Sequence, residues 1–132
     1  AALGGGVLLE LSHEIDYLRW LFGEVTCVRA VHLKQSDLEI DVEDTAHLLL
    51  ELSDTRGAKV IATLNMDFVR RDATRTCTVI GSTGTMRWDG LSDTVEVFEA
   101  GQDSWNIQFR GDQDPDESYR AELRHFFDCV DG

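Results

Sequence analysis

The sequence predicts an α+β domain with an open, mostly antiparallel sheet of six or seven strands and helices on one face. Three observations lead to this prediction. Apolar residues recur with helical spacing near both ends of the chain. Between the ends, apolar and polar residues alternate, and short turn sequences separate the candidate strands, which favours antiparallel neighbours over crossover units. The 132 residues fit one domain, residues 1–132.

The first helix is expected over residues 7–22. Its apolar residues follow one helix face with spacings of 3, 4, 3 and 4: Leu8, Leu11, Ile15, Leu18 and Phe22. Gly23 comes next and suits the position just after a helix. Ser12 could instead cap a shorter helix that begins at His13. The apolar stripe runs unbroken through Ser12, however, and this favours the longer helix.

Seven segments alternate apolar with polar residues and are predicted strands. The second is the clearest, because every second residue is apolar and would lie on one side of the sheet. The strands are expected at residues 25–33, 46–52, 60–68, 74–80, 85–88, 94–99 and 105–110. Turn sequences lie between them at residues 54–57, 81–84, 89–90 and 100–101.

A second helix is expected to close the chain. Asp114 is a suitable N-cap, Pro115 suits the first helical position, and Glu117 completes a capping box. The apolar residues that follow share one helix face: Tyr119, Leu123, Phe126, Phe127 and Val130.

One face of the predicted sheet has no helix to cover it. Two helices cover one side, and polar side chains should solvate the other. Five large apolar residues nevertheless fall on the polar registers: Val28, Leu49, Ile61, Ile80 and Phe98. Scattered surface hydrophobes are common, but a face this apolar favours a partner surface.

The net charge of −13 and the pI of about 4.5 limit the possible partners. A chain this acidic repels phosphate backbones and anionic membrane surfaces, so neither nucleic acid nor membrane is expected as a partner. Cys27, Cys77 and Cys129 are far apart and form no C-x-x-C pair. This spacing argues against a disulfide scaffold and a metal site, and it predicts a reducing, cytoplasmic environment.

The sequence carries none of the standard nucleotide-binding motifs. No G-x-G-x-x-G follows a predicted strand, and the glycines of residues 81–84 lie at a strand-to-strand turn. The chain begins at Ala1 without an initiating Met or a basic region. We therefore expect that this start is not a signal peptide and that the chain is a fragment of a longer protein.

The polar face of the first helix holds the densest group of reactive side chains. With 3.6 residues per turn, Glu10, His13, Asp16 and Tyr17 fall close together, opposite the apolar stripe. Histidine can both accept and return a proton near neutral pH, and a carboxylate one turn away can orient its ring. The alternative is an ordinary solvated face, which the spacing alone favours.

Positive charge gathers near the end of the third predicted strand. Arg70, Arg71 and Arg75 lie there and could meet an anionic ligand. The alternative is that they offset the acidity of the chain itself.

Three segments together resemble a known family. Residues 4–16, GGGVLLELSHEID, and residues 18–23, LRWLFG, resemble the opening of the C-terminal domain of the Gfo/Idh/MocA oxidoreductases. These are the relatives of glucose-fructose oxidoreductase and inositol dehydrogenase. Residues 79–86 resemble the strand-turn-strand of that domain, and residues 126–132 resemble its closing helix.

The resemblance implies the second domain of a two-domain enzyme, with a fold like the C-terminal domain of glyceraldehyde-3-phosphate dehydrogenase. The N-terminal Rossmann domain, which would hold NAD or NADP and the lysine of a Glu-Lys-Pro motif, is absent from this chain. The implied reaction is oxidation or reduction at a CH–OH group of a sugar, sugar derivative or cyclitol. The implied assembly is a homodimer or homotetramer formed through the sheet, and no metal is implied.

The catalytic histidine of the family matches His13, which would be the acid/base group. The family most often has an aspartate four residues before this histidine, where Leu9 stands here; Glu10, three residues before, could replace it. The expected substrate-binding residues are Glu10, Asp16, Tyr17, Arg71 and Arg75. The alternative function is a non-catalytic acidic interaction module that self-associates through its open sheet face.

Overall fold

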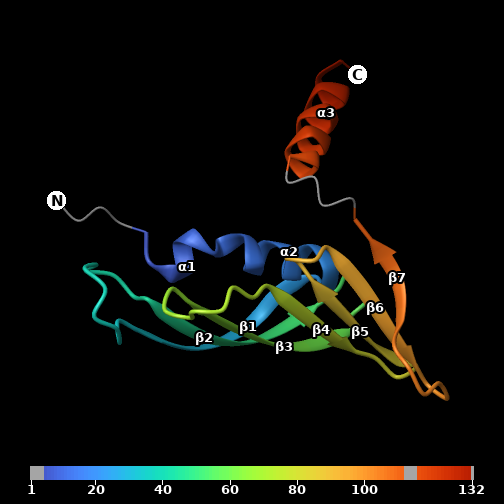
Figure 1. Cartoon of the computed structure of the whole chain (residues 1–132), viewed down its shortest axis with the longest axis horizontal. Coiled ribbons are helices and arrows are strands. Elements are labelled where there is room, and N and C mark those ends of the chain that lie inside the picture. Colours follow the sequence, from blue (N-terminus) through green and yellow to red (C-terminus); the bar gives the residue numbers. More distant parts are fainter. Residues whose placement is uncertain (1–4, 112–115, 132) are drawn as a thin grey trace. The chain divides into compact units, whose positions relative to one another are not determined.

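The computed structural model describes residues 5–111 and 116–131, and it confirms the predicted α+β class (Figure 1). The chain divides into two compact units, residues 1–71 and 72–132. The first contains α1 (Val7–Glu10), α2 (Ser12–Phe22), β1 (Glu24–Leu33), β2 (Thr45–Ser53) and β3 (Lys59–Asp67). The second contains β4 (Thr76–Ile80), β5 (Gly84–Asp89), β6 (Thr94–Glu99), β7 (Asn106–Arg110) and α3 (Glu117–Asp131).

All seven predicted strands are present, and they pair antiparallel in two sheets. The first sheet has the order β1-β2-β3 and the second β4-β5-β6-β7. The chain turns out of the first sheet where β3 ends. There the Asp67 carboxylate accepts hydrogen bonds from the backbone N–H groups of Val69 (2.8 Å) and Arg70 (2.6 Å), which bends the chain away from the strand direction.

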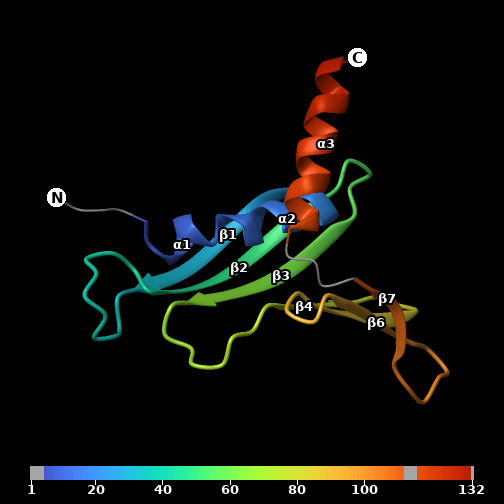
Figure 2. The same ribbon diagram turned by 45° about the horizontal axis from the view of Figure 1, so that its top comes forward.

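The core of the first unit lies between its helices and one face of β1–β3 (Figure 2). Strict alternation along β2 places its apolar residues on the helix side, as predicted, and Leu50 and Leu52 are only 2% and 1% exposed. Val7 from α1, Leu18 from α2 and Met66 from β3 complete this buried cluster.

The predicted single helix over residues 7–22 is broken at Leu11. This residue has φ −105° and ψ 24°, outside the helical range, and it separates α1 from α2. Its N–H still donates to the carbonyl of Val7 (3.1 Å), and its carbonyl accepts from the N–H of Glu14 (3.1 Å). The apolar stripe predicted one helix because both short helices bury the same side.

Gly23 ends α2, as predicted. Its N–H donates to the carbonyl of Arg19 (2.9 Å), and its φ of 95° lies in the region that favours glycine. A Cβ at this position would also collide with the carbonyl oxygen of Ser53. Glycine is therefore favoured here for two independent reasons, the backbone angle and the close approach of β2.

A β-bulge between Val25 and Cys27 changes the predicted faces of β1. Beyond the bulge, Val28 pairs with Leu50 and so points to the helix side, where the sequence had placed it on the open face. Val31 and Leu33 pair with His47 and Thr45 on the opposite face. In the first sheet the expected apolar face is present with Leu49 and Ile61 as predicted, whereas Val28 leaves it and Val31 and Leu33 join it.

In the second unit, α3 confirms the predicted closing helix, whereas the proposed caps Asp114 and Pro115 lie outside the described residues. The apolar side chains of α3 are all between 53% and 72% exposed: Tyr119, Leu123, Phe126, Phe127 and Val130. None of the helices among the described residues is long and apolar enough to cross a membrane.

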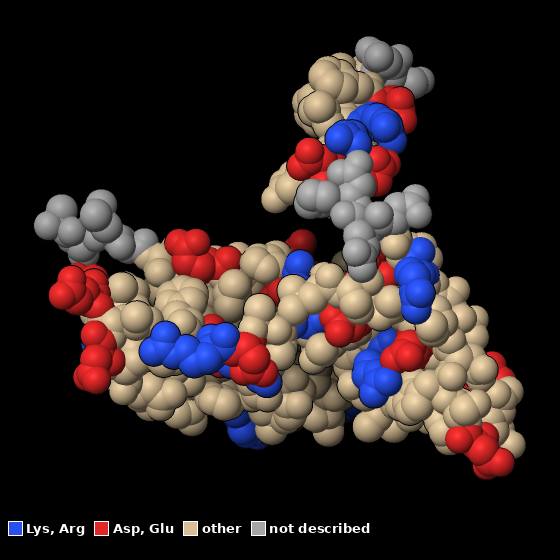
Figure 3. All heavy atoms as spheres, in the orientation of Figure 1, with Lys and Arg blue, Asp and Glu red and all other residues tan. Residues whose placement is uncertain are grey.

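Asp44 is a buried carboxylate that the sequence did not single out. It is 0% exposed and accepts hydrogen bonds from the N–H groups of Gln35 and Ser36 (both 3.0 Å) and from the hydroxyls of Ser36 and Thr45. These bonds, led by the Ser36 hydroxyl, hold its pKa well below the ordinary 3.8. Asp44 thereby links the acidic loop 34–44 to the start of β2 by hydrogen bonds. Acidic side chains are visible at that end of the first unit in Figure 3.

We expect Asp44→Asn to lower the melting temperature at pH 7 by several degrees, because an amide cannot accept from all of these donors. The pKa of Asp44 is lowered in the folded chain, so its stabilising effect is complete well above pH 3.8 and is lost as the pH falls below that value. Thermal unfolding from pH 7 to pH 3 measures both effects. The control is Asp37→Asn, in the same loop but exposed. Equal stability of the two variants at pH 7 would contradict the assignment.

Candidate functional site

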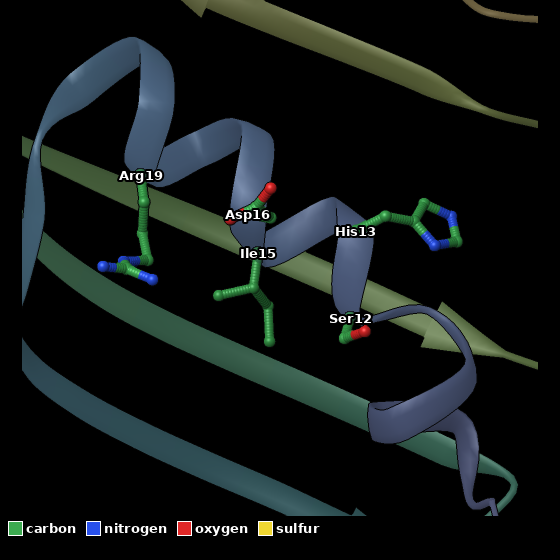
Figure 4. Close-up of a pocket in the computed structure, with 5 residues that line it drawn as sticks. All are labelled: Ser12, His13, Ile15, Asp16 and Arg19. Carbon is green, nitrogen blue, oxygen red and sulfur yellow. The ribbon is translucent and has the colours of Figure 1, made fainter. Parts of the chain in front are cut away.

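The candidate site is a hollow of about 490 Å³ beside α2. Its lining residues are Ser12, His13, Ile15, Asp16 and Arg19. Figure 4 shows these side chains on successive turns of the helix, with His13 projecting away from the helix. The side chain of His13 is 52% exposed. An imidazole in this position can accept a proton from a bound molecule or return one to it.

The break at Leu11 separates Glu10 from this hollow. Glu10 ends α1, and its carboxylate lies so close to Gly5 that a Cβ on that glycine would collide with it. The carboxylate next to His13 is instead that of Glu14, whose Oε1 lies 3.2 Å from Nε2 of His13. Helix spacing did not point to Glu14, because adjacent positions on a helix do not normally face each other.

Two other predicted residues lie on α2. Asp16 is exposed and lines the hollow beside His13. Tyr17 is half-buried and packs against the core of the first unit. The helix thus brings Asp16 to the hollow with His13, while the ring of Tyr17 contacts the apolar interior.

Arg19 lines the hollow and was not predicted. Its guanidinium forms an ion pair with Glu24, with Nη2 2.8 and 2.9 Å from the two carboxylate oxygens and Nε 3.1 Å from one of them. A signal was present in the sequence, since Arg19 follows Asp16 by three residues on the same helix face. Glu24 offsets much of its positive charge, so an anion entering the hollow would have to compete with that carboxylate.

The two predicted arginines belong to different units of the chain. Arg71 is exposed in the segment that follows β3, in the first unit. Arg75 belongs to the second unit, where its guanidinium carbon lies 5.3 Å from the ring centroid of Trp88. This distance is typical of a cation–π contact.

The described residues contain no Rossmann-type dinucleotide motif. In that motif a glycine-rich turn leads from a strand into the N-terminus of a helix. The glycine turn at residues 81–84 instead joins β4 to β5, and these strands pair antiparallel. Across residues 5–111 and 116–131, no group of three or more His, Cys, Asp or Glu side chains is arranged to hold a metal ion.

Comparison with protein families gives one match. The family described as the GFO/IDH/MocA C-terminal domain matches residues 1–87, which is most of the chain. Comparison with curated proteins gives no match.

Several solved structures share the fold. UDP-N-acetylglucosamine 3-dehydrogenase GnnA from Acidithiobacillus ferrooxidans matches with a TM-score of 0.76 and 21% identity over 94% of this chain and 38% of that chain. The WlbA dehydrogenase from Bordetella pertussis, in complex with NADH and UDP-GlcNAcA, matches with a TM-score of 0.65 and 24% identity over 97% and 36%. An oxidoreductase from Agrobacterium radiobacter, in complex with NAD+, L-tartaric acid and magnesium, matches with a TM-score of 0.73 and 21% identity over 95% and 39%. The chain therefore spans less than two fifths of the length of each.

Proposed function

Because this chain belongs to the GFO/IDH/MocA family, as a C-terminal domain, we propose that it is the substrate-binding and oligomerisation domain of an NAD(P)-dependent oxidoreductase. The substrate carries a CH–OH group and is a sugar, a sugar derivative or a cyclitol. The observation that carries this proposal is the half-exposed imidazole of His13 in a hollow beside Asp16. Similar folds in a UDP-N-acetylglucosamine dehydrogenase and in a UDP-GlcNAcA complex favour a sugar nucleotide.

In this proposal, His13 moves the proton. The O–H bond of the substrate hydroxyl breaks as an N–H bond forms on the imidazole. The carbon becomes a carbonyl carbon as its C–H bond also breaks and its hydride leaves, for which a nicotinamide would be the acceptor. Asp16, in the same hollow, accepts hydrogen bonds from other hydroxyl groups of the substrate and so orients the sugar or cyclitol ring. The nicotinamide supplies the hydride chemistry, and a part of the longer protein outside this chain holds it.

The remaining predicted residues have supporting roles. Glu10, Tyr17, Arg71 and Arg75 stay as proposed substrate-binding residues of the complete enzyme. We also propose a cytoplasmic location, which the three free thiols favour: Cys27, Cys77 and Cys129.

The test is an assay of the longer protein that contains this chain. We expect NAD+ or NADP+ to be reduced in the presence of UDP-N-acetylglucosamine or a related sugar nucleotide, and more slowly with the free sugar or with inositol. Absorbance of the reduced nicotinamide measures the rate. If the purified protein binds a nicotinamide but oxidises none of these compounds, the proposed substrate class is wrong.

The 132-residue chain alone should show no turnover and no tight nicotinamide binding, because its sequence has no G-x-G-x-x-G motif to hold the pyrophosphate. Calorimetric titration with NAD+, NADH, NADP+ and NADPH measures the binding. The longer protein serves as the positive control. Low-micromolar affinity of the 132-residue chain for any of the four would contradict the proposal that the nicotinamide is held outside this chain.

We further propose that the protein forms a homodimer or homotetramer through the open face of the first sheet. That face exposes Val31, Leu33, Leu49 and Ile61, by 64%, 45%, 39% and 74%. Such apolar surface favours association. Association should increase with salt, which screens the repulsion between chains of net charge −13.

Ile61→Asp should shift the protein towards the monomer in sedimentation velocity, because it places a charge on the apolar face. Leu38→Asp is the matched control, since Leu38 is 42% exposed but lies in the loop between β1 and β2. A wild-type chain that stays monomeric at high protein concentration and high salt would rule out association through the sheet.

A further inference from the structure

We propose that Glu14 is the positioning residue of His13: it holds the proton of the neutral imidazole on Nε2 and leaves Nδ1 to take the proton of the substrate hydroxyl. The inference rests on the proposed function, because it concerns the same site. Neither the family resemblance nor the helix spacing pointed to Glu14. Both suggested a carboxylate on the preceding turn.

The carboxylate of Glu14 contacts the imidazole of His13. Oε1 of Glu14 lies 3.2 Å from Nε2 of His13. A carboxylate oxygen can only accept a hydrogen bond, whereas a neutral imidazole has one nitrogen that donates and one that accepts. The electrostatically favoured tautomer therefore carries its proton on Nε2, the nitrogen that faces the carboxylate. The unprotonated nitrogen is then Nδ1.

The side chains of Glu14 and His13 differ in burial. The side chain of Glu14 is 12% exposed, and that of His13 is 52% exposed. Glu14 also lies in the first turn of α2, where the helix dipole favours a negative charge. A carboxylate confined by packing beside an accessible imidazole is suited to orient the ring without blocking it.

Other charged groups are less suited to orient the His13 ring. Glu10 lies on α1 beyond the break, with its carboxylate beside Gly5. Asp16 is exposed in the hollow, where it can meet the substrate. Arg19, the positive group of the hollow, pairs with Glu24. Of these charged groups, Glu14 is the one whose ion pair involves the ring of His13.

The first experiment needs no turnover and uses the 132-residue chain. Nitrogen-15 NMR of the His13 ring, recorded at a pH where the ring is neutral, distinguishes the two tautomers. We expect wild type and Glu10→Gln to show the Nε2–H form, and Glu14→Leu to show the tautomeric mixture of a freely solvated imidazole. Circular dichroism confirms that Glu14→Leu is folded, and Glu14→Gln provides a milder change if it is not. An unchanged tautomer ratio in the folded Glu14 variants would overturn the proposal.

The second experiment measures activity in the longer protein. Loss of a carboxylate that orients a metal-bound histidine costs about 10- to 100-fold in activity. We expect a loss of the same order here, so Glu14→Leu should lower kcat by about 10- to 100-fold with little change in KM. Glu51→Gln, which changes an exposed carboxylate of β2 that pairs with Arg29, should stay near wild type. If His13→Ala loses turnover while Glu14→Leu keeps it, the positioning role is wrong but the proposed function stands. If His13→Ala keeps turnover, the catalytic role fails, and the NMR result alone decides whether Glu14 orients the ring.

Discussion

His13→Ala in the longer protein should lower kcat by about 10²- to 10⁴-fold, the usual contribution of a positioned acid–base group. The proton leaves the hydroxyl only in the chemical step, so substrate binding should change far less than turnover. Alanine leaves the helix intact, because it is the best helix former and His13 is half-exposed. Steady-state kcat and KM with the sugar nucleotide are the quantities to compare.

The matched control for this variant is His47→Ala. His47 is also exposed in the first unit, but it lies on β2 and its Nδ1 is 2.7 Å from Oδ1 of Asn65. We expect near-wild-type turnover from His47→Ala. Near-wild-type turnover from His13→Ala would mean that the hollow on α2 is an ordinary solvated helix face. An equal loss from both variants would point to a change in the fold.

Leu50→Ala should lower the free energy of unfolding by about 2–5 kcal/mol, the range for a leucine removed from a packed core. Leu50 is 2% exposed, lies in the central strand of the first sheet, and belongs to the cluster that joins this sheet to α1 and α2. The cavity left by the side chain is enclosed by β2 and its neighbours, so only partial collapse is possible. Urea unfolding at neutral pH measures the loss.

Leu49→Ala is the internal control for the core. Leu49 is the adjacent residue, points to the opposite face and is 39% exposed. Its loss should cost less than about 1 kcal/mol, provided that unfolding is measured at a protein concentration where the chain is monomeric. Comparable losses from Leu49→Ala and Leu50→Ala would contradict the observed orientation of β2.

The reading of β2 and β3 from the sequence succeeded because a strand has a period of two. Once Ala46, Leu48, Leu50 and Leu52 are assigned to one strand, their common face follows from backbone geometry, and only one face can be covered by helices. Gly23 was predictable in the same way, because few other residues adopt the backbone angle that ends α2.

In β1, alternation assigned side chains to the wrong faces, because the sequence of an apolar-rich strand does not reveal a β-bulge. Val25, Cys27, Val28 and Val31 can be divided between the faces in two ways. The choice depends on how β1 pairs with β2. The break at Leu11 was hidden for a similar reason, since both helices bury their apolar residues against the same sheet.

The sequence by itself determined the α+β class, the positions of the seven strands and the core face of β2, because these follow from local periodicity. His13 became the candidate acid/base group through the resemblance to a family, since the helix spacing alone favoured a solvated face. The tertiary structure alone decided which carboxylates stand beside which groups. Glu14 lies next to His13, Glu10 is turned towards Gly5, and Asp44 is buried among the donors of its loop. Such contacts depend on where a helix breaks and how a loop packs. A carboxylate can occupy many positions on a helix or loop at similar local cost, and only the packing of the folded chain selects one of them.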